Sequence, residues 1–294
     1  MCISLSSDRL GVEIVLPGQE PNTTNRFDRA GFITQVTLDG KYKFCTREPD
    51  NLTHPCSGGI GLCSEYQTDA PAREAQIGAR FIKPGIGLLT KTEVRDYIFH
   101  KRYQAELFPI SWEQHLESVT FVTEPIPCQG FALLLTKQIK VDGSILTMTM
   151  NASNVGAREI DLVEYCHNFV TIDRLPIGPA YRLDLHKIAN QDGKLSPEVN
   201  GTFTGSGSGY SFTGYNPRAA MVHVKPADIL PDVPFYWELS HANSLARIRE
   251  TDSFIPDEVA VWSIDHIISP EVFHHLALKP GASETWSRFW SFNA

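Results

Sequence analysis

The sequence has no run of about 18 or more consecutive apolar residues, and this absence excludes a membrane-spanning helix. It also has no cluster of basic residues, because 26 lysines and arginines are dispersed against 34 acidic residues, for a net charge of -8. An acidic surface repels phosphate groups, so we expect neither a nucleic acid nor a membrane as a partner. Asp8, Arg9 and Glu13 interrupt the N-terminal segment, which lacks the apolar centre of a signal peptide.

Cysteine is scarce, with six residues and no C-x-x-C pair. This argues against a disulfide framework for a chain of 294 residues and against zinc-ribbon and thioredoxin-like sites. Cys45 and Cys166 lie in apolar strand-like runs, where a free thiol packs as a small hydrophobic group. We therefore expect a reduced, cytoplasmic protein. A disulfide between Cys56 and Cys63 in a secreted protein is the alternative.

Helical periodicity is also scarce. The one short helix that the sequence predicts begins at Ser269, with Pro270 at its first position and Glu271 in its first turn. Alternation of apolar and polar residues, which is typical of strands, dominates instead. The predicted strands are 30–38, 42–47, 88–95, 117–124, 130–141, 144–152, 159–169, 201–212, 221–225, 234–239, 258–264, 273–278 and 284–292.

The connections between these strands predict antiparallel pairing. Asp-Gly pairs at 39–40, 142–143 and 192–193 supply the positive φ angles that tight hairpins need, and the second pair joins two long predicted strands. The Gly-Ser stretch 205–209 is short and reads as a loop rather than a linker. Many strands without alternating helices predict an all-β fold, a large antiparallel β-sandwich. We expect one domain over residues 1–294.

The strand that ends at residue 169 carries the most informative residues. Its last residues, VEYCHNF, present one histidine, His167, among Glu, Tyr, Cys and Asn. A strand can aim a histidine rigidly into a concave sheet, and the side chain titrates near neutral pH. His167 is therefore a candidate proton donor. The alternative is a half-buried histidine that is hydrogen-bonded to a neighbouring carbonyl.

Four segments, in their order along the chain, resemble the aldose 1-epimerase (galactose mutarotase) superfamily. The order and spacing of these segments carry the resemblance, and they indicate a divergent branch. The matching segments are 25–31 (NRFDRAG) with the hairpin 37–41 (TLDGK), then 165–169 (YCHNF), 259–266 (VAVWSIDH), and 278–281 (LKPG) before the last aromatic strand.

The resemblance implies a mutarotase-like β-sandwich that exchanges the α and β anomers of an aldose or aldose derivative without a cofactor. Such a reaction needs a base for the anomeric hydroxyl and an acid for the ring oxygen. His167 is the candidate acid and Asp265 the candidate base. The family has an Asn-His order where this chain has His167-Asn168, and a glutamate where it has Asp265. The family's His-Gly-Gly segment is not intact either, because three residues separate His54 from the first glycine.

Six further residues are candidates for substrate binding. Arginine can donate two hydrogen bonds to adjacent oxygens, and convergence of Arg26 with Arg29 and Lys83 would favour a sugar phosphate. Several alternatives stay open: an exposed ion-pair cluster around Asp28, a turn at 265–266, a turn at 83–87 and a strand-edge charge at position 65. The six candidates are Arg26, Arg29, Glu65, Lys83, Asn168 and His266.

We expect no metal site. His274 and His275 are neighbours on opposite faces of a strand, and no other histidines have the spacing of metal ligands. Trp262, Trp286 and Trp290 are interpreted as core residues rather than as sugar-stacking platforms. The expected partner is a small carbohydrate, and the protein is expected to be a monomer or a homodimer.

Three classes of function are compatible with the predicted fold. The first is a carbohydrate isomerase, which needs a carboxylate and His167 facing each other about a sugar ring apart. The second is a non-catalytic sugar-binding protein, which needs aromatic platforms but no paired acid and base. The third is an oligosaccharide lyase or hydrolase; a lyase that acts on uronic acids would need a basic cluster along its groove.

Overall fold

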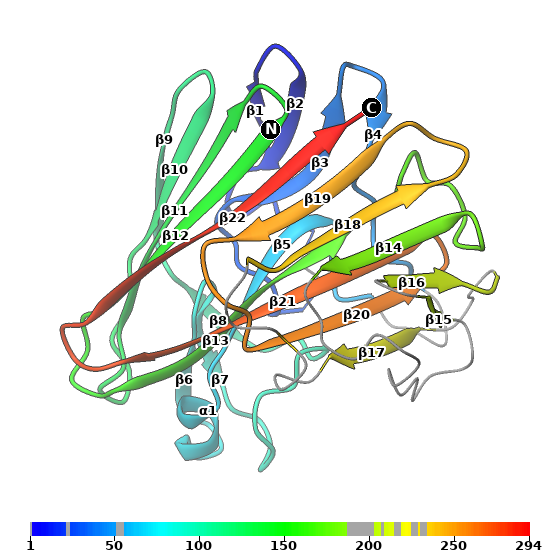
Figure 1. Cartoon of the computed structure of the whole chain (residues 1–294). Coiled ribbons are helices and arrows are strands. Elements are labelled where there is room, and N and C mark those ends of the chain that lie inside the picture. Colours follow the sequence, from blue (N-terminus) through cyan, green and yellow to red (C-terminus); the bar gives the residue numbers. More distant parts are fainter. Residues whose placement is uncertain are drawn as a thin grey trace.

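The computed structural model describes residues 2–21, 24–50, 56–186, 203–206, 209–214, 219–224, 229 and 234–294. Over these residues the chain forms two large antiparallel sheets that pack face to face, and a small third sheet (Figure 1). The all-β sandwich predicted from the sequence is confirmed. No helix among the described residues is long and apolar enough to cross a membrane.

The first large sheet carries the site described below. Among the described residues it has nine strands, in the order β1-β2-β3-β5-β13-β21-β20-β17, with β4 paired to β3. Its strands are β1 (Cys2–Ser6), β2 (Leu10–Val15), β3 (Phe32–Leu38), β4 (Tyr42–Lys43), β5 (Gly61–Gln67), β13 (Ile160–Phe169), β17 (Ala220–Val224), β20 (Glu258–Ile264) and β21 (Ile267–Leu278).

The second large sheet covers the inner face of the first. Its order is β15-β16-β14-β18-β19-β22-β12-β11-β10-β9 over the described part of the chain. Its strands are β9 (Ile110–Gln114), β10 (Ser118–Thr123), β11 (Leu133–Asp142), β12 (Ile145–Asn154), β14 (Tyr181–His186), β15 (Phe203–Ser206), β16 (Gly209–Phe212), β18 (Tyr236–His241), β19 (Arg247–Asp252) and β22 (Ser283–Asn293).

The third sheet and a short helix lie together beyond the end of the large sheets (Figure 1). The sheet consists of β6 (Arg80–Lys83), β7 (Gly87–Thr90) and β8 (Ala105–Leu107), and the helix is α1 (Ala70–Glu74). The turn predicted at 83–87 connects β6 to β7, with Gly85 at φ 75°.

The core fills the space between the two large sheets. Strands such as β11 and β12 bury every second residue, as side chains on one face of a strand must. The main hydrophobic cluster joins Leu62 and Val272 of the first sheet to Leu146 and Trp286 of the second. Trp286 and Trp290 are fully buried, in agreement with their interpretation as core residues.

Two of the three predicted Asp-Gly hairpins are confirmed. Asp39 and Gly40 have φ angles of 52° and 65° between β3 and β4, and Gly143 has a φ of 55° between β11 and β12. The third pair, at 192–193, lies outside the described residues, as does His54. The cysteines Cys56 and Cys63 are both free thiols, so the alternative disulfide is not present.

The predicted helix at Ser269 is wrong, because these residues belong to β21. The Ser-Pro-Glu sequence has the residues of a helix start, but β-sheet pairing on both sides overrides this local signal. Pro270 has no N–H to donate, and a central strand tolerates it where the ladder is interrupted. Pairing between β13 and β21 includes Tyr165 with Phe273 and resumes beyond the proline as the bridge between Val170 and Ile268.

Candidate active site

A cavity of about 400 Å³ lies on the face of the first sheet that points away from the core. Period-two alternation along the strands selects the side chains on this face. β13 contributes Tyr165 and His167, and β21 contributes Glu271 and Phe273. Trp262 of β20 also lines the cavity, which corrects its interpretation as a core residue.

His167 and Glu271 lie side by side in the wall of this cavity. Nδ1 of His167 lies 2.8 Å from Oε1 of Glu271, although the two groups are not aligned as a hydrogen bond. Ser269 Oγ donates a hydrogen bond of 3.3 Å to the same carboxylate oxygen. The side chains of His167 and Glu271 are only 6 % and 3 % exposed, which strengthens the electrostatic interaction between them.

Arg26 contacts the other side of the histidine ring. Its Nη2 lies 2.7 Å from Nε2 of His167. A guanidinium group can only donate, so Nε2 accepts this hydrogen bond and the neutral ring carries its proton on Nδ1, facing Glu271. The resting site thus holds His167 between a cation and a carboxylate.

A fully buried carboxylate, Glu65 on β5, fixes the position of Arg26. It accepts hydrogen bonds from Arg26 Nε at 2.7 Å, from the Tyr165 hydroxyl at 2.6 Å and from Lys83 Nζ at 3.2 Å. Burial alone would raise the pKa of Glu65, but Lys83 and Arg26 outweigh burial and hold this pKa well below its ordinary value. Glu65 is therefore an ionised anchor beneath the cavity and not the strand-edge charge of the alternative interpretation.

The pKa of His167 reflects opposing influences. Burial is the largest influence and lowers it, and the nearby Arg26 lowers it as well. The Glu271 carboxylate, with a smaller contribution from Glu65, outweighs both, so the net pKa lies above 6.5. The protonated form is the one that can act as an acid, and a raised pKa keeps more of it at neutral pH.

Removal of the Glu271 charge should reverse this shift. In Glu271→Gln the pKa of His167 is expected to fall below 6.5, because burial and Arg26 still lower it and only the smaller raising contribution of Glu65 remains. Titration of the histidine ring resonances by NMR measures both values. An unchanged His167 pKa in the variant would contradict the pairing described here.

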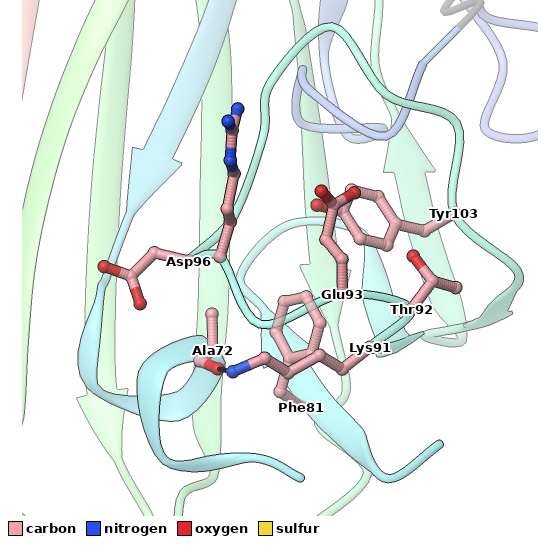
Figure 2. A pocket seen from close by; sticks show the side chains of 8 residues that line it. Ala72, Phe81, Lys91, Thr92, Glu93, Asp96 and Tyr103 are labelled. Carbon is pink, nitrogen blue, oxygen red and sulfur yellow. Dashed lines mark hydrogen bonds between the residues drawn. The ribbon is translucent and has the colours of Figure 1, made fainter. Parts of the chain in front are cut away.

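A loop between β7 and β8 closes one side of the cavity. Phe99 in this loop lines the cavity, and the Arg26 guanidinium lies over its ring at 4.3 Å from the centroid. The base of the loop is anchored beside α1, where Lys91 donates a hydrogen bond to the carbonyl of Ala72 (Figure 2). Tyr103, at the other end of the loop, packs edge-on against Phe81.

Asp265 and His266 lie in the turn between β20 and β21, as their alternative interpretation proposed. Asp265 has a φ of 56°, and its carboxylate lies 2.7 Å from Nδ1 of His266. His266 Nε2 in turn lies 2.6 Å from the hydroxyl of Thr46. Neither residue is among those that line the cavity in the described part of the chain.

Asn168 points to the opposite side of β13 from His167, because adjacent residues of a strand face opposite ways. Its amide donates to Glu250 and to the carbonyl of Pro270, and it accepts a hydrogen bond from the Trp290 indole. It is fully buried between the sheets, so its geometry favours a structural role over substrate binding.

Arg29 and Lys83 do not converge with Arg26 on an open anion site. Arg29 pairs with Glu20 at 2.7 Å and donates to the Phe108 carbonyl, whereas Lys83 is buried against Glu65. Asp28 has a separate partner, because Lys137 of the second sheet lies 2.5 Å from its carboxylate. These ion pairs are buried, in contrast to the exposed cluster considered from the sequence.

Glu271 was not singled out as a site residue from the sequence. The reason is the apparent helix start at Ser269, which placed Glu271 in the first turn of a predicted helix. Once the segment is a strand, two facts indicate the site. First, Glu271 shares a face of β21 with Phe273. Second, β13 and β21 pair Tyr165 with Phe273, and this register places Glu271 opposite His167.

Comparison with known proteins identifies the architecture. No family model and no curated protein sequence matches the chain. A galactose mutarotase-like protein from Lactobacillus casei superposes with a TM-score of 0.60 at 11 % identity, covering 100 % of both chains. A galactose mutarotase related enzyme from Lactobacillus acidophilus gives a TM-score of 0.58 at 11 % identity, covering 100 % of this chain and 98 % of that one.

A third solved structure, the GalM/aldose epimerase homologue from C. elegans, gives a TM-score of 0.56 at 12 % identity. The match covers 100 % of this chain and 98 % of that one. At these identities the likeness concerns the fold, and sequence similarity alone carries no catalytic residue across. The chain has the fold of the galactose mutarotase-like proteins, as the resemblance in its sequence indicated.

Proposed function

We propose that the protein interconverts the α and β anomers of an aldose by acid–base catalysis, with His167 as the acid and Glu271 as the base. The observation that carries this proposal is the 2.8 Å contact between the two side chains on neighbouring strands of a cavity wall. Glu271 takes the role that the sequence resemblance suggested for Asp265, because its carboxylate is the one beside His167.

The reaction chemistry suits an acid and a base that lie side by side. The sequence predicts that the two groups face each other about a sugar ring apart, whereas the structure places them in contact. However, the anomeric oxygen and the ring oxygen are both bonded to C1, so the two proton transfers take place at neighbouring atoms. Adjacent groups on β13 and β21 can therefore serve them together.

The proposed steps balance without a cofactor. Glu271 accepts the proton of the anomeric hydroxyl while protonated His167 donates to the ring oxygen. The C1–ring oxygen bond breaks and the C1=O bond of the open-chain aldehyde forms. After rotation about C1–C2, ring closure on the other face of the carbonyl reverses both proton transfers.

Arg26 has to move for the acid to work. Protonated His167 carries a proton on Nε2, and this proton cannot face the Arg26 donor 2.7 Å away. In the protonated state the guanidinium turns from the ring toward the substrate, and Glu65 keeps it tethered through Nε. Arg26 is then the substrate-binding group and Glu65 a positioning residue.

The charges around the cavity favour a neutral sugar. Glu48, Glu258 and Glu271 line it, and Arg26 is its one arginine or lysine within the described residues. Because Arg26 is already paired with Glu65, a phosphate or a uronate would enter a field dominated by carboxylates. The same balance disfavours a lyase that acts on uronic acids.

The test is a polarimetric assay on freshly dissolved α-aldoses, with glucose, galactose and their 6-phosphates as a panel. We expect wild type to accelerate the approach to anomeric equilibrium for the neutral sugars and to act less on the phosphates. Acceleration that persists undiminished in His167→Ala would contradict the proposal. Saturable sugar binding with no acceleration would point instead to a non-catalytic sugar-binding protein.

A further inference from the structure

The cavity contains a second histidine–glutamate pair that the proposed reaction does not use. Nδ1 of His223, on β17, lies 2.5 Å from Oε1 of Glu258, on β20. Both residues line the same cavity as His167 and Glu271, and their side chains are 52 % and 41 % exposed. The reacting pair is buried, whereas the second pair lies at the open rim.

The sheet register places His167, Glu271 and His223 on one row across the sheet, with Glu258 beside it. Tyr165 of β13 pairs with Phe273 of β21, and the same register places His167 opposite Glu271. Glu271 in turn pairs with Ala260 of β20. Ala260 pairs with His223 of β17. Residues opposite one another in antiparallel strands share a face. The strands β13, β21, β20 and β17 follow one another across the sheet, as Figure 1 shows. The order along the row is therefore acid, base, methyl group, histidine.

The spacing of this row corresponds to one pyranose ring. Glu271 and His223 are separated by two strand spacings, or about 10 Å between backbones. A pyranose ring measures about 6 Å between the oxygens on C1 and C4, and a hydrogen bond of about 2.8 Å at each end gives a similar span. The residue between Glu271 and His223, Ala260, has only a methyl side chain and is buried.

Aromatic residues flank the row on either side. Phe273 lies opposite Glu258, and Trp262 lies opposite Ser269 and Met221. Both aromatic side chains line the cavity, and each lies two residues along its strand from a member of the row. Apolar rings of this kind pack against the C–H faces of a sugar, which leaves the sugar hydroxyls directed along the row.

We propose that His223 and Glu258 form a recognition site for the end of the sugar opposite its reacting carbon, with the hydroxyl on C4 as their ligand. A carboxylate accepts hydrogen bonds, an imidazole nitrogen donates or accepts one according to its tautomer, and a hydroxyl group can do both. The orientation of the sugar rests on the proposed function, because it places C1 at His167 and Glu271. The pair then determines which aldoses are held productively.

The experiment uses methyl glycosides, which bind as pyranoses but cannot open their rings. The dissociation constants of methyl glucopyranoside and its 4-deoxy analogue are measured by NMR titration with wild type and with His223→Ala. Wild type is expected to bind the 4-deoxy sugar about 10- to 100-fold more weakly, the effect of losing one hydrogen bond to an ion-paired side chain. His223→Ala is expected to bind the two sugars with similar dissociation constants, near that of wild type for the 4-deoxy sugar.

The matched control is His115→Ala, which removes an exposed histidine 3.5 Å from Glu113 on another part of the surface. This variant should discriminate as wild type does. Equal binding of both glycosides by wild type, no binding of either, or discrimination retained by His223→Ala would each overturn the inference. An equal loss of affinity for both glycosides in a folded His223→Ala variant would overturn it as well.

The outcomes separate this inference from the proposed reaction. Discrimination in binding that His223→Ala abolishes, together with no acceleration of anomer exchange, would support the recognition site and contradict the reaction alone. Anomer exchange by a wild type that binds the two glycosides equally would support the reaction and contradict the recognition site.

Discussion

Replacement of Glu271 by glutamine is expected to lower kcat for anomer exchange by about 10²- to 10⁴-fold, the usual contribution of one general base. Glutamine has nearly the same shape but cannot accept the proton of the anomeric hydroxyl. It also removes the charge that raises the pKa of His167, so less of the acid is protonated at neutral pH. Both effects reduce the rate, and steady-state polarimetry measures their sum.

The control for this variant is Asp265→Asn. Asp265 lies in the β20–β21 turn at a φ of 56°, a conformation that asparagine also adopts, and its carboxylate faces His266. The change should leave kcat within a few-fold of wild type. A large loss in Asp265→Asn with little loss in Glu271→Gln would return the base role to Asp265.

Replacement of Arg288 by methionine is expected to lower the free energy of unfolding by about 3–5 kcal/mol at pH 7. The guanidinium is fully buried between the sheets, 2.6 Å from Glu164, 3.2 Å from Glu250 and 3.3 Å from Asp252. Without it, three carboxylates remain in the core without their common cation. Urea unfolding of wild type and variant measures the difference.

The loss should shrink as the pH falls. Burial already raises the pKa of Asp252 well above its ordinary value, and Glu250 raises it further; burial also raises the pKa of Glu250. An acid whose pKa is raised by folding binds more protons in the folded state, so stability decreases as pH rises through that range. Protonation at low pH therefore relieves the repulsion that the methionine variant suffers.

The control for Arg288 is Arg158→Met. Arg158 pairs with Glu74 at 2.7 Å, but both side chains are more than two-fifths exposed, and such surface pairs contribute about 0–1 kcal/mol. A loss below about 1 kcal/mol in Arg288→Met, or equal losses in both variants, would contradict the importance given to the buried cluster.

Local patterns explain why much of the fold could be predicted. Strands such as β12 and β20 were predicted closely because side-chain alternation is a property of each strand by itself. The Asp-Gly turns at 39–40 and 142–143 are equally local. β21 was predicted only in its second half, because the local sequence at Ser269 favours a helix start and only pairing with β13 and β20 overrides it.

The candidate site was predicted only in part, for a related reason. Four of the predicted residues do lie together: Arg26, Glu65, Lys83 and His167. Which side chain contacts which depends on the order of the strands in the sheet. The neighbours β13 and β21 are separated by about 100 residues in the sequence, so local patterns do not show that they pair. Asn168 is different, because alternation alone places it on the opposite face from His167. The pattern was in the sequence, and the resemblance to the family's Asn-His segment outweighed it.

The most direct test is two-dimensional NMR exchange spectroscopy on the anomeric protons of an equilibrated aldose with wild type and Glu271→Gln. We expect exchange cross-peaks between the α and β signals with wild type, and their loss with the variant at equal concentration. No exchange with wild type on any neutral aldose, or undiminished exchange with Glu271→Gln, would contradict the assignment of Glu271 and His167 as the reacting pair.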